Sequence, residues 1–538
     1  ISLTNGAGQT AILNVTGNLT QSAGAQLLIR GTALANTGSI APTNTRFIVN
    51  GTMPAEVNGL IPGFYGNATS ATGNATSFVR NNATPGVGLA ILQASDYTLN
   101  SFAGGPTANV DLTTAQTISA NQSANAIRTS VGITVKGGTT HDVGAGGLKT
   151  TAGDTIAGPG NDNFGGNPGY LMNGSTGTVT FSGPVTGSNG LFVGGAGIVT
   201  FTGDLSGLTG GYTNNSGTTN FNTATFGASQ NITIRQGTVA SNNAAFGTGT
   251  GTVTLGDPNT PAGTSTIATL NISNAAITTF ARPIVTVGSD GTAPFSATSG
   301  LTLSTATTVA QNITGAITLG THLTINSGGT NNTTFSGLIT GGGGLHVLGG
   351  VVVVNNASNS YAGGTQLQAG TLVAAADALG TGNLRLFGGT VRTDYAGNFS
   401  RGLTMVGAGT INTNGNNINM TGGISGENPN ANLTKSGAGT LTVNGSGTFA
   451  GQLLVTAGEV RLAGPSGALF GRGTTTVSPT ATLTLDNTAA NNNNRFTRDV
   501  TLTGATTSTF QLIGNASTAT DQSVGALFVS GGTVAQPH

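Results

Sequence analysis

Short runs in which apolar residues stand two apart, separated by glycine-rich turns, constrain the fold of this chain most strongly. Residues 433–462 hold three such runs: Leu441-Thr442-Val443, Leu453-Leu454-Val455 and Val460-Arg461-Leu462. Spacing of this kind is typical of a half-buried strand, and Gly, Ser or Asn between the runs indicates tight turns. The stretch leaves no room for a helix.

The same unit recurs upstream in the chain. Copies begin at Leu191, Leu345 and Leu433, and each carries later residues at matching distances. These later residues are Leu208, Tyr361 and Phe449, followed nine positions on by Gly217, Gly370 and Gly458. Repeats of a few tens of residues indicate a solenoid, in which each unit buries its core face against its neighbours. With strands this short, the sequence predicts an all-β fold, a parallel β-helix with roughly 20–25 residues per coil.

Interruptions of the rhythm divide the chain into three regions. Residues 1–50 read as N-terminal solenoid coils, and residues 111–538 as β-helix whose repeats are clearest at 181–255, 335–395 and 420–485. Residues 51–110 contain proline and aromatic residues with few clean alternations, so we expect an insertion or elaborated loop there. Insertions of this kind often carry a binding function, and a structural elaboration that only covers an edge of the scaffold is the plainer interpretation.

The balance of charge and the lack of cysteine exclude several classes of partner and site. Lys plus Arg is 16 and Asp plus Glu is 16, so the chain offers no basic stripe for nucleic acid or anionic lipid. Cys is 0, which rules out disulfides and zinc–thiolate sites. No apolar run reaches the ~20 residues of a membrane helix. The plentiful Thr, Val and Ile favour an ordered β protein over disorder.

Two stretches, GAGTLTVNGSGTFAGQLLVTAGEVRL and YAGGTQLQAGTLVAAADALGTGNLRLFGGTV, resemble the passenger-associated strand repeat of bacterial autotransporters. The resemblance is close over 340–465 and partial over 181–255. The matching elements are residues 439–441, 361–365, 370–372 and 378–382. It implies a right-handed parallel β-helix at the cell surface or secreted, used as an adhesin, stalk or fibre and sometimes carrying a grafted enzyme.

Candidate catalytic carboxylates are sparse. Asp154 and Asp162 are the closest pair in sequence, and stacking of successive coils could bring Asp377 near Asp394, or Asp486 near Asp499. A glycosidase needs two carboxyl groups about 5–9.5 Å apart. Solvated charges at turns are the plainer interpretation, and we assign no catalytic residue.

The histidines and serines form no recognisable motif. His346 alternates with Leu345 and Val347 and is expected to face outward, while His322 is expected at a strand end. His141 lies in a glycine-rich stretch and His538 is terminal. HExxH and GxSxG motifs are both missing from the sequence.

One stretch suggests calcium. Residues 158–166, GPGNDNFGG, resemble a single calcium-binding nonapeptide around Asp162, but no second copy follows to share ligands. An Asx-rich turn is the alternative. We therefore predict no cofactor and no metal site.

These observations together predict a non-enzymatic structural or adhesive protein, extracellular or on a bacterial cell surface. Its partners would be further copies of itself, in an oligomer or filament, or a cell surface or glycan. A polysaccharide-acting enzyme on the same scaffold is the alternative. A carbohydrate-binding adhesin is another, and would use Phe64, Tyr65 and Tyr97 of the insertion as a binding platform.

Overall fold

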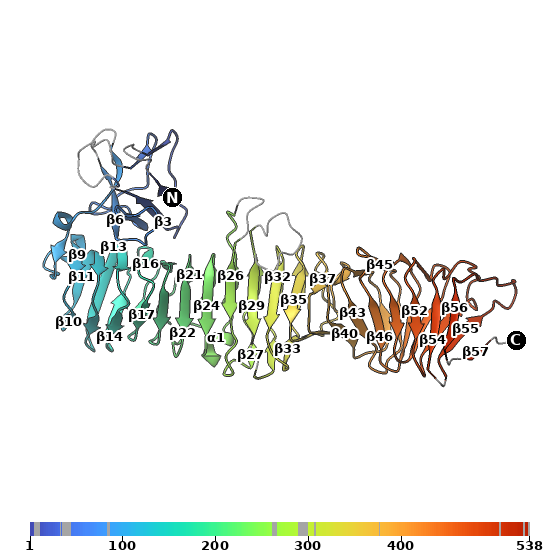
Figure 1. Cartoon of the computed structure of the whole chain (residues 1–538). Coiled ribbons are helices and arrows are strands. Elements are labelled where there is room, and N and C mark those ends of the chain that lie inside the picture. Colours follow the sequence, from blue (N-terminus) through green and yellow to red (C-terminus); the bar gives the residue numbers. More distant parts are fainter. Residues whose placement is uncertain are drawn as a thin grey trace. The chain divides into compact units, whose positions relative to one another are not determined.

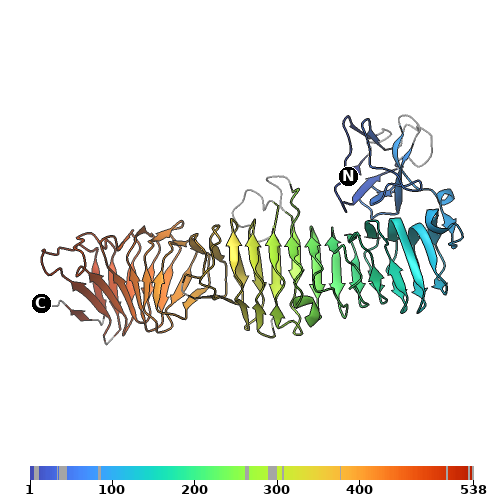
Figure 2. The same cartoon turned by 180° about the vertical axis from the view of Figure 1, so that it is seen from behind.

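The computed structural model of the chain describes all residues except 5–10, 33, 35–44, 83–86, 261–265, 289–299, 306–307, 376, 505–506, 531–532 and 536–538. It divides into two compact units, Ile1–Asp257 with Thr266–Ile277 and Pro258–Ser265 with Thr278–His538. Strands dominate both units (Figures 1 and 2). Helices in the described part are limited to α1 (Ala244–Gly247) and the 3-10 turns η1 (Ala94–Asp96) and η2 (Gly105–Thr107).

Two parallel sheets form the solenoid of the first unit. One contains β8 (Thr98–Leu99), β9 (Asn109–Leu112), β11 (Gln122–Thr129), β13 (Thr140–Thr150), β16 (Gly169–Asn173), β19 (Leu191–Gly195), β21 (Tyr212–Asn214), β23 (Ile232–Ile234) and β25 (Val253–Leu255), with β15 (Asn161–Asn163) and β18 (Val185–Thr186) beside β13. The other contains β10 (Gln116–Ile118), β12 (Ile133–Val135), β14 (Thr155–Ala157), β17 (Thr178–Phe181), β20 (Ile198–Phe201), β22 (Thr218–Phe221), β24 (Gly237–Ser241) and β26 (Ala268–Asn271).

Each coil repeats the backbone position of the coil before it. Leu191 pairs with Tyr212, Tyr212 with Ile232, and Ile232 with Val253, so the coils are 21, 20 and 21 residues long (212 − 191, 232 − 212, 253 − 232). This length lies within the predicted range. The parallel β-helix predicted from the strand period is confirmed.

In-register stacking places identical side chains above one another in the core. Phe181, Phe201 and Phe221 pair in register. Phe246 of α1 continues the stack, so the ring centroids lie 5.2, 5.7 and 5.8 Å apart, and all four side chains are fully buried. Because side chains on a strand alternate in direction, the residues between core positions face outward. Rings in near-parallel contact exclude water from the core along its length.

The N-terminal module, residues 1–92, forms two sheets of its own. The larger contains β1 (Ser2–Leu3), β3 (Leu27–Gly31), β5 (Phe64–Asn67), β6 (Ser77–Asn82) and β7 (Gly88–Ile91), and the smaller contains β2 (Ile12–Val15) and β4 (Arg46–Val49). Their pairing is parallel from β1 to β5 and antiparallel from β5 to β7. The strands of residues 1–50 thus pair in parallel, as strands of successive coils do. Their partners, however, are one another and β5, not the strands of the solenoid. Sheet pairing sets residues 1–92 apart from the strands that follow, although both belong to the same compact unit.

The second unit is also a parallel solenoid. Its longest sheet contains β27 (Thr279–Phe280), β30 (Gln311–Ile313), β33 (Asn332–Phe335), β36 (Val351–Val354), β38 (Thr371–Ala374), β40 (Thr390–Thr393), β43 (Gly409–Asn412), β46 (Leu433–Ser436), β49 (Leu453–Val455), β52 (Thr475–Val477), β54 (Val500–Thr503) and β56 (Leu527–Ser530).

Shorter runs of strands complete these coils. One run contains β29 (Leu301–Thr305), β32 (Leu323–Ser327), β35 (Leu345–Gly349), β37 (Thr365–Leu367), β39 (Leu384–Leu386), β42 (Leu403–Met405) and β45 (Ile424–Gly426), and another β28 (Ile284–Thr286), β31 (Ile317–Leu319) and β34 (Ile339–Gly341). A third contains β41 (Gly397–Phe399), β44 (Ile418–Met420), β47 (Thr440–Val443), β50 (Glu459–Leu462), β53 (Thr482–Asp486), β55 (Thr509–Ile513) and β57 (Thr533–Ala535), and a fourth β48 (Ser446–Thr448) with β51 (Ala468–Phe470). The repeat copies at Leu345 and Leu433 open β35 and β46, so they lie on different faces of their coils.

Two repeat glycines show why the motif requires glycine. Gly370 and Gly458 directly precede β38 and β50 with φ values of 79° and 67°. A Cβ at Gly370 would lie 2.3 Å from the carbonyl oxygen of Gly350, and one at Gly458 would lie 2.4 Å from that of Gly439. The backbone conformation and the close approach of the preceding coil therefore both exclude a side chain.

Replacing Phe201 by Ala tests the aromatic stack. We expect it to lower the free energy of unfolding of the first unit by about 3–5 kcal/mol, because it opens a cavity between two rings. Thr134→Ala, on an exposed position of β12, is the matched control and should have little effect. Denaturant unfolding followed by circular dichroism provides the measurement. Equal losses for the two variants would contradict a close-packed core.

Candidate functional site

The predicted carboxylate pairs do not converge on one another. Asp377 accepts hydrogen bonds from Ser400 (2.6 Å) and Arg401 (3.3 Å), whereas Asp394 binds Arg392 through both carboxylate oxygens at 2.8 Å. Each acid thus binds an arginine of its own, so this pair carries no sign of a shared proton.

Asp486 and Asp499, the second pair predicted from coil stacking, also bind separate partners. Asp486 binds Arg461 at 2.8 Å, and Asp499 accepts the backbone N–H of Ala526 at 2.7 Å. These carboxylates act as anchors for neighbouring coils and turns. None of the described contacts joins two of the predicted acids.

Asp162 lies in a buried pair with His141. The Oδ1 atom of Asp162 is 2.8 Å from Nδ1 of His141, and both residues are almost fully buried. The two residues are one coil apart, at paired positions of β13 and β15. Phe102 packs edge-on against the imidazole with the ring centroids 5.6 Å apart.

This arrangement does not match the calcium hypothesis. Asp162 points inward while the flanking Asn161 and Asn163 alternate to the other side, where they bond to Thr186 and Asp142. Calcium needs six to eight oxygen ligands around one point. No group of three or more His, Cys, Asp or Glu side chains that could hold a metal occurs among the residues that the structure describes.

His346 does not face solvent as the alternation predicted. It pairs in register with Thr324 and Gln366 on the outward side of its sheet, but is only 2% exposed, and Gln366 is buried as well. The prediction failed because the outward-pointing side chains at this position of the sheet are buried too. The alternation within a single strand cannot reveal such burial.

The predicted aromatic platform is also wrong. Phe64 and Tyr65 are buried in the N-terminal module, and the ring of Tyr65 packs 5.5 Å from that of Phe78. Burial raises the pKa of the Tyr65 hydroxyl above its ordinary range. Phe64 belongs to the core of the module, and Tyr65 packs in an apolar cluster that includes Ala126 and Met172 of the solenoid, so these rings are unavailable to a ligand.

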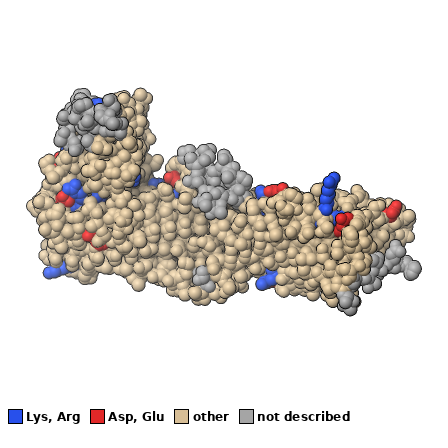
Figure 3. Space-filling view, in the orientation of Figure 1, with Lys and Arg blue, Asp and Glu red and all other residues tan. Residues whose placement is uncertain are grey.

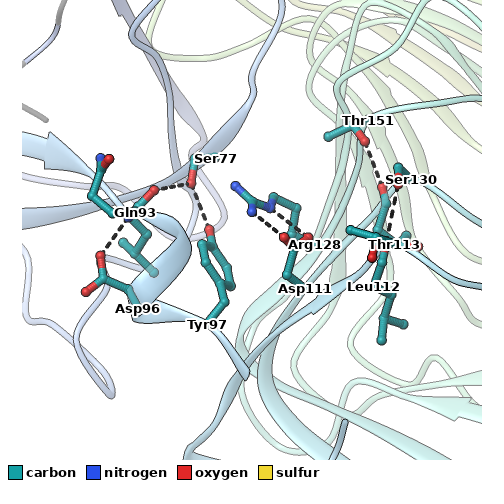
Figure 4. Close-up of polar contacts among 12 residues, drawn as sticks. Ser77, Gln93, Asp96, Tyr97, Asp111, Leu112, Thr113, Arg128, Ser130 and Thr151 are labelled. Atoms are coloured by element: carbon teal, nitrogen blue, oxygen red, sulfur yellow. Dashed lines mark hydrogen bonds and ion pairs between the residues drawn. The ribbon is translucent and has the colours of Figure 1, made fainter. Parts of the chain in front are cut away.

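Tyr97 instead belongs to a polar network that fastens the module to the solenoid (Figure 4). Its hydroxyl lies 2.8 Å from Oγ of Ser77, which donates to the carbonyl of Leu92. The guanidinium of Arg128 lies over the Tyr97 ring, 4.2 Å from its centroid, and binds Asp111 through two nitrogens. Burial of the Tyr97 hydroxyl raises its pKa, so it remains a neutral donor.

A second set of contacts joins the module to the flank of the solenoid. The Gln26 amide donates to the carbonyls of Leu171 (3.2 Å) and Phe192 (3.4 Å). Asn215 donates to Gln26 Oε1 (3.1 Å) and to the carbonyl of Gly24 (2.8 Å). These bonds link residues 145–191 positions apart in the chain, and Figures 1 and 2 show the module beside these strands.

A cleft of about 340 Å³ lies between the module and the solenoid of this unit. Both parts contribute side chains to its walls. The module supplies Gln26, Leu28, Arg30, Asn74 and Ala75, and the solenoid supplies Met172, Asn173, Gly174, Gly195, Ala196, Asn215, Ser216 and Gln236. We call this space the module cleft and take it as the candidate functional site.

The polar residues of the module cleft fall into two groups. Asn173 is saturated: its amide donates to the carbonyls of Gly177 and Ile198 at 2.9 Å, and its oxygen accepts from Thr150. Gln26, Asn215 and Ser216 are likewise engaged in the framework. The saturated group shapes the wall and has little capacity left for a ligand.

The second group of polar side chains keeps hydrogen-bonding groups that a ligand could use. Within the described chain, Asn74 and Gln236 make no side-chain hydrogen bond, and Arg30 makes one, a 3.3 Å bond to the carbonyl of Thr72. Three donors from opposite walls therefore keep unused hydrogen-bonding capacity. The described residues lining the cleft include no carboxylate.

Lys149 lies directly behind the wall of the cleft. It is fully buried, its Nζ donates to the carbonyl of Thr150 at 3.3 Å, and a Cβ built on Gly174 would lie 3.2 Å from that nitrogen. Burial lowers the pKa of Lys149 to about 7, and the nearby charge of Arg128 lowers it further while Asp111 opposes the shift.

Sequence reasoning missed the module cleft. Its binding residues stand in ordinary strand and turn contexts, and the contacts that build it span more than a hundred residues. One local signal was available for His141 and Asp162, since a spacing of one coil length predicts stacking in a solenoid.

Comparisons with known proteins identify no relative: no family model, no curated protein and no solved structure matches this chain. The autotransporter-like resemblance of the repeats thus remains a prediction. Among the described residues, no helix is long and apolar enough to cross a membrane.

Replacing Lys149 by Met tests its buried, uncharged state. The folded pKa of about 7 lies below the ordinary 10.5, so between these values the unfolded chain binds a proton that the folded chain does not. Stability therefore falls as the pH is lowered from about 10 to 7 and stays low below 7. We expect Lys149→Met to raise stability at pH 7 by a few kcal/mol and to flatten this dependence.

Thermal unfolding between pH 6 and pH 10 measures this effect. Lys136→Met, on an exposed residue of the same unit, is the control and should leave the pH dependence unchanged. A Lys149→Met variant that is less stable than the parent at pH 7 would show that the ammonium form is favoured in the fold.

Proposed function

We propose that this chain is an extracellular, non-enzymatic β-helix scaffold that attaches to surfaces through the module cleft. The observation that carries the proposal is the cleft itself. A regular solenoid surface is interrupted by a module whose contacts with the solenoid are saturated, while Arg30, Asn74 and Gln236 keep donors free toward the space between them.

The charge distribution supports binding over hydrolysis. Five of the six candidate carboxylates are engaged by an arginine, a histidine or a backbone N–H, and the sixth, Asp154, has a buried oxygen without a hydrogen-bond partner among the described residues. Lys, Arg, Asp and Glu occupy small, separated patches on the face seen in Figure 3. A surface of hydroxyl and amide groups suits attachment by hydrogen bonds more than by long-range charge.

The extracellular location rests on the repeat resemblance, and the composition is compatible with it. The chain combines zero cysteine with 6% charged residues and abundant Thr, Ser and Asn. Its stability comes from burial and backbone ladders, which need neither a reducing nor an oxidising compartment.

Blocking the module cleft tests the proposal. Ala196 lines the cleft and is exposed, so Ala196→Trp fills the space without disturbing the core. Microspheres coated with the parent chain should adhere to an array of neutral and acidic glycans, and the variant should lose most of this adhesion. Thr134→Trp, on the exposed face of β12, is the matched control. Adhesion unchanged by Ala196→Trp, or no adhesion of the parent, would contradict the proposal.

Self-association is the second part of the proposed role, and we expect it at β56. Leu527 and Val529 continue the core columns of Val500 and Leu502, which are fully buried one coil earlier. They are nevertheless 41% and 52% exposed, and the neighbouring Phe528 is 55% exposed. An exposed apolar edge strand is a template for pairing with another chain.

Sedimentation at increasing concentration measures self-association. The parent chain should form larger species, and Val529→Lys should reduce them at least tenfold in apparent affinity, because it places a charge where a second copy would bury it. Thr501→Lys, on the outward side of β54, is the control. A parent chain that sediments as a monomer at all concentrations would exclude self-association through β56.

A further inference from the structure

The charged side chains at the module cleft indicate which class of ligand it binds. Arg30 is the one charged residue among the described residues that line it, and a second cation, Arg235, stands next to the lining. Arg235 donates to Asn215 Oδ1 at 3.2 Å and to the carbonyl of Ala23 at 3.2 Å. Two guanidinium groups thus lie at the cleft, and its described lining residues include no acid.

The nearest acid of the fastening network does not cancel this charge. Asp111 is held by Arg128 through two nitrogens, so its charge is already neutralised by a direct partner. A bidentate arginine–carboxylate pair satisfies most of the lone pairs of the acid. Among the described residues the guanidinium of Arg30 has no such partner, and its one hydrogen bond there is to the carbonyl of Thr72.

The free groups match the chemistry of a sugar acid. A guanidinium presents a planar fork of donors that fits a carboxylate. The amides of Asn74 and Gln236 each offer donors and an acceptor, which suits hydroxyl groups that both donate and accept. Leu28, Ala75 and Met172 add apolar surface for the carbon–hydrogen face of a ring.

The dimensions agree with a short saccharide. The space of about 340 Å³ lies at the lower end of the range for small-molecule sites, which is roughly 300–1,000 Å³. The backbone N–H groups of the lining glycines Gly174 and Gly195 already donate to the carbonyl of Thr150 and to Oγ of Ser216, so these two groups are not free to form a phosphate-binding nest. One guanidinium with two amides therefore favours a carboxylate over a phosphate.

We infer that the module cleft binds an acidic saccharide, with the sugar carboxylate on Arg30 and ring hydroxyls on Asn74 and Gln236. This inference rests on the proposed adhesive function and names the ligand class for it. Specificity arises because a neutral sugar leaves the Arg30 guanidinium without an anionic partner in a partly enclosed space.

Calorimetric titration of the full chain with trigalacturonate, its methyl ester, a neutral galactose trimer and inorganic phosphate tests this inference. The ester keeps the size and hydroxyl groups of the acid and removes its charge. We expect trigalacturonate to bind at least tenfold more tightly than the ester or the neutral trimer. Phosphate should not compete with it.

Three variants locate the interaction. Arg30→Gln should weaken trigalacturonate binding at least tenfold and leave binding of the ester nearly unchanged. The acid binds more tightly than the ester only when both the guanidinium and the sugar carboxylate are charged. Gln236→Ala, on the opposite wall, should weaken both ligands about threefold and does not depend on the fold of the module. Lys136→Gln removes an exposed charge elsewhere and should change neither.

The outcomes separate this inference from the proposed function. Tighter binding of neutral sugars, with Ala196→Trp still abolishing adhesion, would overturn the acidic ligand and leave the adhesive role intact. Equal affinity for acid and ester, or displacement by phosphate, would overturn it as well. If the parent chain adheres to no glycan at all, both the proposed function and the acidic ligand are overturned.

Discussion

The parallel backbone ladder between successive coils is the interaction on which the rest of the structure depends. Each coil repeats the backbone position of the coil before it, so core side chains form columns such as Phe181, Phe201 and Phe221. The ladder also forces the backbones at turns close together. That closeness explains glycine at positions such as Gly370, where the carbonyl of Gly350 occupies the space of a side chain.

A solenoid built this way has a uniform surface, and a specific site needs an interruption of it. Here the interruption is the N-terminal module. It has its own core and is fastened by two sets of polar contacts and by an apolar cluster in which Tyr65 packs with Ala126 and Met172 of the solenoid. Tyr97 and Arg128 join it at the start of the solenoid, and Gln26 with Asn215 join it along the flank. The module cleft lies between these parts of the first unit. Saturated amides define its walls, and the unpaired guanidinium of Arg30 gives it a preference for anions.

Much of the fold could be predicted from the sequence because its information is local. The alternation in Val460-Arg461-Leu462 predicts β50, in which Val460 and Leu462 are buried and Arg461 faces outward. The site could not be predicted in this way. The Gln26–Asn215 bond spans 189 residues, and no local pattern marks either residue. Phe64 and Tyr65 were misread as a platform because the period of their surroundings is irregular. Phe64 lies in the core of the module, and Tyr65 lies in the apolar cluster between the module and the solenoid.

Chemical cross-linking of two introduced cysteines tests most directly whether the module is seated on the solenoid. The chain contains no cysteine, so Gln26→Cys with Asn215→Cys provides an isolated pair whose parent side chains are in contact at 3.1 Å. A short bismaleimide should join them within one chain at high dilution, detected by the mass of the linked peptides. A pair of Gln26→Cys with Thr134→Cys on the other sheet should not be joined. Failure of the first pair to link, or equal linking of both, would contradict the seated module and the cleft it forms.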